Sequence, residues 1–250
     1  MVQKRRPFQG VLNILSFNRH YYVFGLIAIA VLFATRLFIM WPTFIFWIVV
    51  GAFLYGLIMP LLVSAYVYDF SGYYRFDWLQ KVVYNKKNAE VIVNINAGFD
   101  ETSFILGAKF PVADVKVFDF YDAGRHTEPA IKRARKVSLE YPNTKEIASH
   151  SIPLKDKSVD LVFLLSAAHE IRSNSEKVQL LKECRRVCKP DGNVVMVEHL
   201  RDFPNFVAFS IGFTHFFSRA TWKRAFEDAG FSFFAETKFT PFMSIFKCGV

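Results

Sequence analysis

Residues 152–202 decide the fold, and they read IPLKDKSVDLVFLLSAAHEIRSNSEKVQLLKECRRVCKPDGNVVMVEHLRD. The stretch holds two apolar runs, Val159–Leu165 and Asn193–Val197, whose length and composition are typical of buried strands. The first run is followed by the polar pair His169–Glu170, and the second ends in Glu198–His199. Both predicted strands therefore carry ionisable side chains at their carboxyl ends.

A helix is predicted between the two runs. Its apolar residues recur at helical spacing and share one face: Leu180, Leu181, Cys184 and Val187. The segment Lys189–Gly192 contains Pro and Gly, so we expect a turn that ends the helix. Strand, helix and strand in this order form one βαβ unit of a parallel sheet. Ligands of such sheets bind beyond the carboxyl ends of the strands, where these ionisable groups stand.

The block also carries a family resemblance. The residues that match the family pattern are Ile152-Pro153, Asp156, Ser158-Val159-Asp160, His169-Glu170, Arg186-Val187 and Lys189-Pro190-Asp191-Gly192. In this pattern the chain resembles the class I S-adenosylmethionine-dependent methyltransferases, in particular those that methylate ubiquinone and menaquinone precursors. The resemblance covers most of residues 75–250. It implies an α/β fold with a doubly wound, seven-stranded, mostly parallel sheet, and a methyltransferase with S-adenosylmethionine as its cofactor.

The cofactor-side half of the pattern is less complete. A strand is predicted at Glu90–Ile95, followed by a turn and by a helix that runs to Lys109. The acidic residue and three glycines of the family correspond here to Asn94, Asn96, Gly98 and Asp100, so one glycine of three remains. Asn tolerates positive φ better than most residues, which makes Asn96 an acceptable replacement for glycine. The resemblance implies that Asn94, Asn96 and Gly98 bind the cofactor.

Further cofactor contacts are expected at later strand ends. Asp119 ends the second predicted strand, where an acidic residue would accept hydrogen bonds from ribose hydroxyls, and Asp122 is the alternative. Ser149 and His150 stand where the family places an Asp near the adenine amino group. Ser166, directly after the strand 159–165, completes the predicted cofactor set.

His169 is the first candidate for catalysis. It would point into the cleft between cofactor and acceptor, where an imidazole of ordinary pKa can take a proton from a phenol or enol. Glu170 would either orient His169 or cap the following helix. His199 is the second catalytic candidate and His215 a weaker third, and each could instead be a hydrogen-bonded structural residue. We expect no metal site, because Cys184 and Cys188 lack ligand partners nearby in sequence and suit packing.

Two apolar stretches precede the α/β region. Tyr21–Met40 and Thr43–Tyr66 each approach the ~20 residues that cross a bilayer, and only Trp41-Pro42 separates them. The sequence therefore predicts an antiparallel transmembrane hairpin. A hairpin that enters one leaflet without crossing it is the alternative. Arg36 lies near the outer turn and can extend its charge to the membrane surface.

Basic residues flank the predicted hairpin on both sides. They are Lys4, Arg5, Arg6 and Arg19 before it, and Arg75, Lys81, Lys86 and Lys87 after it. The positive-inside rule then places both termini and the catalytic domain in the cytoplasm, in a cell membrane protein with two spans. Because the positive charge adjoins apolar segments, we assign the net charge of +9 to the membrane and expect no nucleic-acid partner.

Four parts are expected along the chain. They are a basic cytoplasmic N-terminus at 1–20, the hairpin at 21–68, an interfacial linker helix at 69–88 and the methyltransferase-like domain at 89–250. The family resemblance offers a second interpretation of Tyr68–Tyr74, as the segment that closes over the active site. The Phe-rich stretch Phe203–Phe217 could line an acceptor pocket, lie on the bilayer or pack in the core.

The sequence thus predicts a membrane-anchored methyltransferase that moves a methyl group from S-adenosylmethionine to a lipophilic acceptor. A quinone precursor, a phenolic lipid or a pigment would fit this class. The incomplete glycine pattern supports an alternative, a catalytically degenerate methyltransferase fold that acts as a binding or scaffold protein at the membrane. The oligomeric state stays open.

Overall fold

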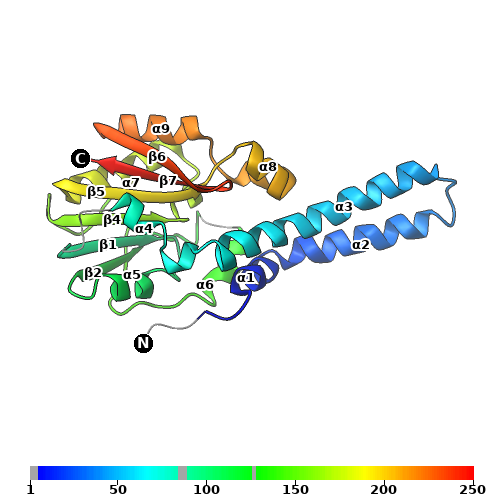
Figure 1. The fold of residues 1–250 in the computed structure, drawn as a ribbon, viewed down its shortest axis with the longest axis horizontal. Coiled ribbons are helices and arrows are strands. Elements are labelled where there is room, and N and C mark those ends of the chain that lie inside the picture. Colours follow the sequence, from blue (N-terminus) through cyan, green and yellow to red (C-terminus); the bar gives the residue numbers. More distant parts are fainter. Residues whose placement is uncertain (1–4, 84–88, 126–127) are drawn as a thin grey trace.

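The chain folds into a sheet domain from which a helical hairpin projects (Figure 1). The computed structural model describes residues 5–83, 89–125 and 128–250. Lys4, Lys86 and Lys87, three of the charges used to orient the hairpin, lie outside the described residues.

The sheet contains seven strands in the order β3-β2-β1-β4-β5-β7-β6. The strands are β1 Val91–Asn96, β2 Asp114–Asp119, β3 Lys145–Glu146, β4 Val159–Leu165, β5 Cys188–His199, β6 Phe233–Thr240 and β7 Met243–Gly249. Strand β7 runs antiparallel to both β5 and β6, and the other pairs are parallel. The predicted doubly wound α/β fold with a mostly parallel sheet is confirmed.

Helices cover both faces of this sheet (Figure 1). They are α5 Ser103–Lys109, α6 Pro129–Arg135, α7 Asn174–Val187, α8 Phe203–Phe209 and α9 Arg219–Asp228, with 3₁₀ turns η3 Ala168–Glu170 and η4 Ser210–His215. Ser173, Asp202 and Ser218 begin α7, α8 and α9, and each side chain accepts a hydrogen bond from a backbone N–H of the first turn. These caps satisfy donors that the helix itself leaves open.

Strand β4 is the centre of the core. All seven of its residues are buried, as expected for an inner parallel strand covered on both faces. On one face it packs with the predicted apolar stripe of α7, and Cys184 and Cys188 lie in this cluster as buried free thiols. Their assignment to packing is confirmed. On the other face, residues 63–83 pack against the sheet.

The start of β5 differs from the prediction. We expected a turn at Lys189–Gly192, but the strand begins at Cys188, directly after α7. A register irregularity in the β4–β5 pairing absorbs the extra residues. A Cβ on Gly192 would come within 2.6 Å of the Cys188 Sγ and 2.9 Å of the Asp160 carbonyl oxygen, so this close approach requires glycine.

The hairpin consists of α2 Arg19–Thr35 and α3 Thr43–Ser64, which run side by side (Figure 1), and α1 Gln9–Phe17 precedes it. The first helix is shorter than predicted: it ends at Thr35 rather than at Met40, and the connection spans seven residues, 36–42. Arg36 lies in this connection with its guanidinium 4.6 Å from the centre of the Phe46 ring.

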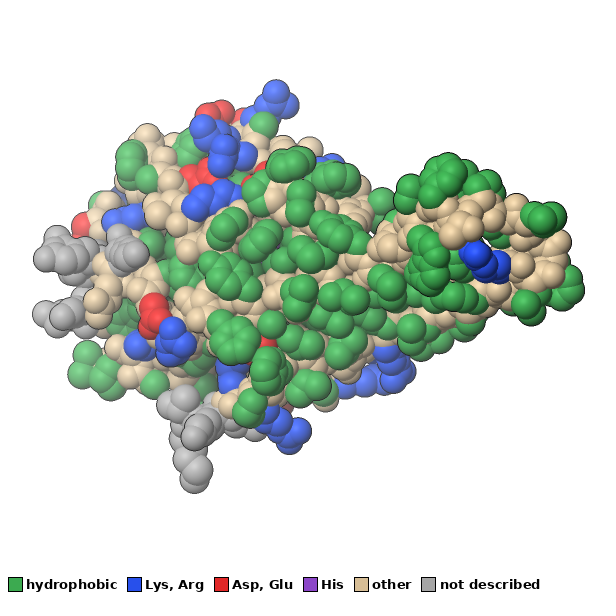
Figure 2. Space-filling view, turned by 45° about the vertical axis from the view of Figure 1, so that its right-hand side comes forward, with side chains coloured by type: hydrophobic (Ala, Val, Ile, Leu, Met, Phe, Trp, Pro, Cys, Tyr) green, Lys and Arg blue, Asp and Glu red, His purple; other side chains and the backbone are tan. Residues whose placement is uncertain are grey.

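Helix α3 is long and apolar enough to cross a membrane. The helical stretch that begins with α3 extends to Arg75 across a bend at residues 71–72. Its most apolar window has a mean hydropathy of 2.3, and 11% of that window is buried. Helices α1 and α2 pass the same test only as a pair, with a bend of 73° between them. Figure 2 shows hydrophobic side chains covering the hairpin and the adjoining face of the domain.

The predicted interfacial linker helix is not one continuous helix. Helix α3 continues as a π-helical turn, η1 Ala65–Phe70, and is followed by the short pieces η2 Tyr73–Arg75 and α4 Leu79–Val82. Tyr73 and Trp78 are each 2% exposed and pack on the sheet. This part of the chain belongs to the core of the domain because it covers one face of β1 and β4. The rest of the predicted linker, residues 84–88, lies outside the described residues.

Asp160 ties the start of β1 to β4 and β5, and we expect its removal to destabilise the domain. Its carboxylate accepts from the backbone N–H groups of Glu90 and Val91 at 3.0 and 2.9 Å, and from Lys189 Nζ at 2.8 Å. Asp160→Ala leaves these donors without their acceptor and should cost about 1–3 kcal/mol, measured by urea unfolding in detergent.

The matched control is Asp114→Ala, which breaks an exposed ion pair with Lys116. That change should cost less than about 1 kcal/mol. Equal unfolding midpoints for the two variants would show that the Asp160 contacts contribute no more than a surface pair.

Candidate active site

A cavity of about 190 Å³ lies at the carboxyl ends of β1 and β4. The parts of the chain that line it are Arg5 and helix α1, the tyrosine-rich segment after α3, the turn after β1, helix α6, the end of β4, and turn η3. Two predicted site residues, Ser166 and His169, line the cavity together with Glu170. The sheet therefore places its cavity at the edge where the sequence predicts a ligand.

The turn after β1 is organised by its one remaining glycine. Gly98 adopts φ 88°, in the left-handed region that favours glycine, and its N–H donates to the Asn96 Oδ1 at 3.0 Å. Asn96 itself is the last residue of β1 and does not have positive φ. It therefore stabilises the turn through its side chain and not, as we expected, by replacing a glycine conformation.

Asn94 and Asp100 hold the start of α5. The Asn94 amide donates to the hydroxyls of Thr102 at 3.0 Å and Ser103 at 2.8 Å, and Asp100 Oδ1 accepts from the N–H groups of the same two residues. The Asn94 Oδ1 and Asp100 Oδ2 atoms are buried without a hydrogen-bond partner among the described residues. Two unpaired buried acceptors next to this turn fit a ligand that brings a positively charged donor, such as an ammonium group.

Asp119 is engaged by an arginine that the sequence did not single out. Its carboxylate accepts from Arg135 at 2.7 Å and from the Tyr121 N–H at 2.8 Å. Arg135 also lies against the glycine turn, because a Cβ on Gly98 would approach the Arg135 Cγ to 2.8 Å. Arg135 thus occupies the space between Gly98 and Asp119, where the resemblance places the cofactor ribose.

Ser149 and His150 lie apart from the cavity lining. The Ser149 hydroxyl donates to Glu176 Oε1 at 2.6 Å, and His150 is exposed. Ser166 does line the cavity, with φ 53°, and its hydroxyl lies 3.3 Å from that of Tyr73. Of the seven predicted cofactor residues, Ser166 alone lines the cavity. Asn94, Asn96 and Gly98 lie in β1 and the turn after it, and Asp119 ends β2, whereas Ser149 and His150 lie apart from this turn.

His169 is held between two carboxylates. Its Nδ1 lies 2.7 Å from Glu198 Oε2, and its Nε2 lies 3.5 Å from Glu170 Oε1. Burial lowers the pKa of His169, but the charges and hydrogen bonds of Glu198 and Glu170 outweigh it and raise the pKa to about 10. The polar groups at the ends of β4 and β5 do meet, as predicted. The expected imidazole of ordinary pKa is not found, because the two carboxylates raise the pKa of His169 and so hold the ring protonated at neutral pH.

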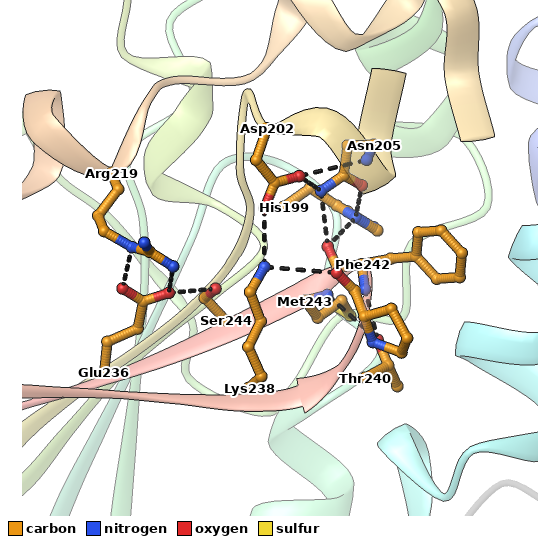
Figure 3. Close-up of polar contacts among 11 residues, drawn as sticks. His199, Asp202, Asn205, Arg219, Glu236, Lys238, Thr240, Phe242, Met243 and Ser244 are labelled. Atoms are coloured by element: carbon orange, nitrogen blue, oxygen red, sulfur yellow. Dashed lines mark hydrogen bonds and ion pairs between the residues drawn. The ribbon is translucent and has the colours of Figure 1, made fainter. Parts of the chain in front are cut away.

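His199 acts on the cavity through a tyrosine. Its Nδ1 lies 2.9 Å from the Phe242 carbonyl oxygen, which can only accept, so this nitrogen carries the proton (Figure 3). Burial lowers the pKa of His199 to about 4, so the ring is neutral and its Nε2 accepts from the Tyr68 hydroxyl at 2.8 Å. Tyr68 lines the cavity, whereas His199 is not part of the lining.

Figure 3 shows how the surroundings of His199 are assembled from several elements. The Asn205 amide donates to the Asp202 carboxylate and to the Phe242 carbonyl oxygen. Lys238 donates to Asp202 from strand β6, at 2.8 Å. These contacts join α8 to the β6–β7 hairpin and fix the ring of His199.

The N-terminal helix forms a wall of the cavity that the sequence did not reveal. The Gly10 N–H at the start of α1 donates to Asp69 Oδ1 at 2.9 Å, and Arg5 pairs with Glu101 at 2.5 Å. The Arg5 guanidinium also lies 3.5 Å from the centre of the Tyr74 ring. The segment after α3 and helix α1 together cover the site, which favours the second interpretation of Tyr68–Tyr74.

The residues in and beside the turn after β1, which borders the cavity through Ala97 and Phe99, suit S-adenosylmethionine in their chemistry. The unpaired oxygens of Asn94 and Asp100 are acceptors suited to the methionine ammonium. The Asp119 carboxylate, which Arg135 occupies, is of the type that ribose hydroxyls require. The backbone of Gly98 leaves room for close approach when the Arg135 side chain is displaced.

Comparisons with known proteins agree with this architecture. Residues 112–196 match the family described as "Methyltransferase domain". A demethylmenaquinone methyltransferase of Thermotoga maritima is 27% identical over 147 residues, which is 58% of each protein. A highly reducing polyketide synthase of Pyrenophora dematioidea is 29% identical over 160 residues, 56% of this chain but 6% of that protein. The chain thus spans less than two thirds of these curated relatives.

Solved structures share the fold. A SAM-dependent methyltransferase from Aquifex aeolicus superposes with a TM-score of 0.51 at 18% identity, covering 72% of this chain and 93% of that one. Human N-acetylserotonin methyltransferase in complex with SAM gives a TM-score of 0.50 at 15% identity, covering 78% and 55%.

The position of Arg135 predicts that its removal strengthens cofactor binding. Arg135→Ala frees Asp119 and the space beside Gly98, and it removes an ion pair that the cofactor would otherwise have to break. When an ion pair that contributes about 1.4 kcal/mol no longer has to be broken, the Kd for S-adenosylmethionine falls roughly tenfold. Calorimetry in detergent measures this change.

Lys132→Ala is the matched control, since it removes one positive charge from the exposed side of the same helix. Its Kd should equal that of the unaltered chain. An unchanged or higher Kd for Arg135→Ala would mean that Arg135 does not stand in the place of the cofactor.

The sheet order, the cavity at its carboxyl edge and the family match agree with one another. They support the sequence-based prediction of a methyltransferase that uses S-adenosylmethionine. Residues 112–196 therefore match a methyltransferase domain, in a chain that has the fold of S-adenosylmethionine-dependent methyltransferases of known structure.

Proposed function

We propose that the protein is a membrane-anchored methyltransferase that moves a methyl group from S-adenosylmethionine to an oxygen or carbon of a lipophilic acceptor, such as a quinone precursor, a phenolic lipid or a pigment. One observation carries this proposal. The cavity lies at the root of the hairpin, where α1 and the segment that continues α3 form part of its lining. An acceptor dissolved in the bilayer would therefore reach the site along the hairpin.

The dimensions of the hairpin support membrane insertion. Helix α3 has 22 residues, about 33 Å at the usual rise per residue, and the hydrocarbon core of a bilayer is ~30 Å thick. Helix α2, with 17 residues, is about 26 Å long and would form the second span. Large side chains on both helices are exposed, among them Tyr21, Phe24, Trp47 and Ile48, and a bilayer would cover them.

Flanking charge supports the orientation. Arg5, Arg6 and Arg19 precede the first span and Arg75 follows the second, so these basic residues adjoin the domain end of the hairpin. By the positive-inside rule, both termini and the catalytic domain then lie in the cytoplasm, and the protein is a two-span protein of the cell membrane.

The Phe-rich stretch 203–217 supports contact with the membrane. Phe203, Phe206 and Ile211 are exposed on α8 and η4, at 76%, 47% and 84% of their surface. Helix α8 adjoins α3, and the Tyr55 hydroxyl donates to the Val207 carbonyl oxygen at 2.6 Å. The apolar surface of the hairpin therefore continues onto the domain, and the membrane interpretation of this stretch is the one we adopt for its outer side chains.

In methyl transfer the main task of the protein is to position the cofactor and the acceptor relative to one another. The cofactor supplies an electrophilic methyl group on a sulfonium, and the protein must hold the acceptor in line with it. His169 lines the cavity, and its ring is fixed by the fully buried Glu198. We place His169 against the reacting group of the acceptor. Tyr68, held by His199, and Tyr73 also line the cavity and, with α1, exclude water.

A scaffold or binding function is the second candidate. It is favoured by one observation, the Arg135 guanidinium that engages Asp119 and crowds Gly98. A protein in which Arg135 never leaves this place would keep the fold without binding cofactor. Absence of calorimetric S-adenosylmethionine binding up to millimolar concentration, for both the unaltered chain and Arg135→Ala, would establish this alternative.

The proposed reaction can be tested without knowing the acceptor. Lipid extract of the source cells is incubated with the detergent-purified full chain and S-adenosylmethionine that carries a labelled methyl group. We expect label in the lipid fraction, and mass spectrometry then identifies the product by the gain of one methylene. His169→Gln should lower the rate by about 100-fold, because it removes the group placed against the acceptor.

His150→Gln is the control, since His150 is exposed and does not line the cavity. It should transfer label at the unaltered rate. Cofactor binding without any transfer of label to lipid would exclude a lipophilic acceptor in that extract. Equal rates for His169→Gln and the control would remove His169 from the mechanism.

A further inference from the structure

Five titratable side chains from distant parts of the chain meet beside the cavity. They are Glu128 before α6, His169 and Glu170 on η3, Glu198 on β5, and His215 on η4. The rings of His169 and His215 lie 5.1 Å apart at an angle of 76°. Three carboxylates thus surround two imidazoles at the edge of a cavity that His169 and Glu170 line.

Both His169 and His215 turn their Nδ1 atom toward a carboxylate. His169 Nδ1 lies 2.7 Å from Glu198 Oε2, and His215 Nδ1 lies 3.4 Å from Glu128 Oε2. A carboxylate that binds one ring nitrogen orients the ring and turns the other nitrogen, Nε2, toward a different group, which for His169 is the Glu170 carboxylate at 3.5 Å. Histidines that coordinate metal ions in proteins are usually held in this way.

One donor atom from each of three side chains lies close enough to the others to share an ion. The metal-binding atoms of His169, Glu170 and His215 lie within 4.8 Å of one another. Ligands at 2.0–2.2 Å from an ion are at most about 4.4 Å apart, so small side-chain rotations suffice. We propose that His169, Glu170 and His215 bind one divalent transition-metal ion of the Zn²⁺ or Co²⁺ type, with Glu198 and Glu128 orienting the two imidazoles.

The donor set and the local charge suit such an ion. Two imidazole nitrogens and one carboxylate oxygen are ligands that zinc and related metals accept, and one position is left open for water or a ligand. Arg172 is a neighbouring cation, but its guanidinium donates to the carbonyl oxygens of His169 and His215. It therefore helps to hold the two ligand-bearing segments together, and the carboxylates supply the negative charge for the metal.

The inference goes beyond the proposed methyl transfer, and its test measures binding alone. The tag-free full chain is purified in detergent, treated with a chelator, and titrated with Co²⁺ by visible absorption and with Zn²⁺ by calorimetry. We expect one equivalent of each metal to bind. The Co²⁺ spectrum should show ligand-field bands without thiolate charge transfer, because the three cysteines are buried elsewhere in the fold.

Variants locate the ion. His215→Ala removes a ligand but leaves Glu198 and His169 in place, so metal affinity should fall at least tenfold while circular dichroism stays unchanged. Glu128→Gln removes the orienting carboxylate and should weaken binding roughly 10- to 100-fold. His150→Ala is the control and should bind as the unaltered chain does. Failure of the unaltered chain to bind either metal, or equal affinity in His215→Ala and His150→Ala, would overturn the proposal.

Discussion

The site depends on the carboxylate of Glu198, which is fully buried at the end of the central part of the sheet. A buried carboxylate is costly unless a hydrogen bond or a positive charge compensates its lost hydration. His169 provides this compensation from η3, through its backbone N–H at 3.3 Å and through Nδ1. The short turn after β4 is thereby fastened to the end of β5, and His169 and Glu170 are brought to the cavity.

The residues that replace the acidic residue and two of the glycines of the family pattern form a second hydrogen-bond network. Asn94 and Asp100 bind the first residues of α5, and Asn96 closes the turn around Gly98. This network holds the turn in place, although two of three glycines are absent. The side chain of Arg135 then decides access to the turn, since it uses both the free space beside Gly98 and the acceptor of Asp119.

The hairpin and the site are physically continuous. Asp69, just after α3, binds the first turn of α1, and Arg5 connects the N-terminal segment to Glu101 in the turn after β1. Any displacement of α3 relative to the domain would therefore be transmitted to the wall of the cavity. This coupling gives the hairpin a role in shaping the site in addition to its proposed role as an anchor.

The sequence by itself determined the parallel sheet, the apolar face of α7 and the apolar character of the hairpin, because periodicity is set by residues close together in the chain. It also identified His169, Ser166 and the turn after β1, since the carboxyl ends of parallel strands meet at one edge. Only the tertiary structure decided the rest. Arg135 reaches Asp119, Tyr68 meets His199 and His215 approaches His169 through contacts between segments that no local pattern relates. The charge on each imidazole was likewise undetermined by sequence, because it depends on how many carboxylates the fold brings to each ring.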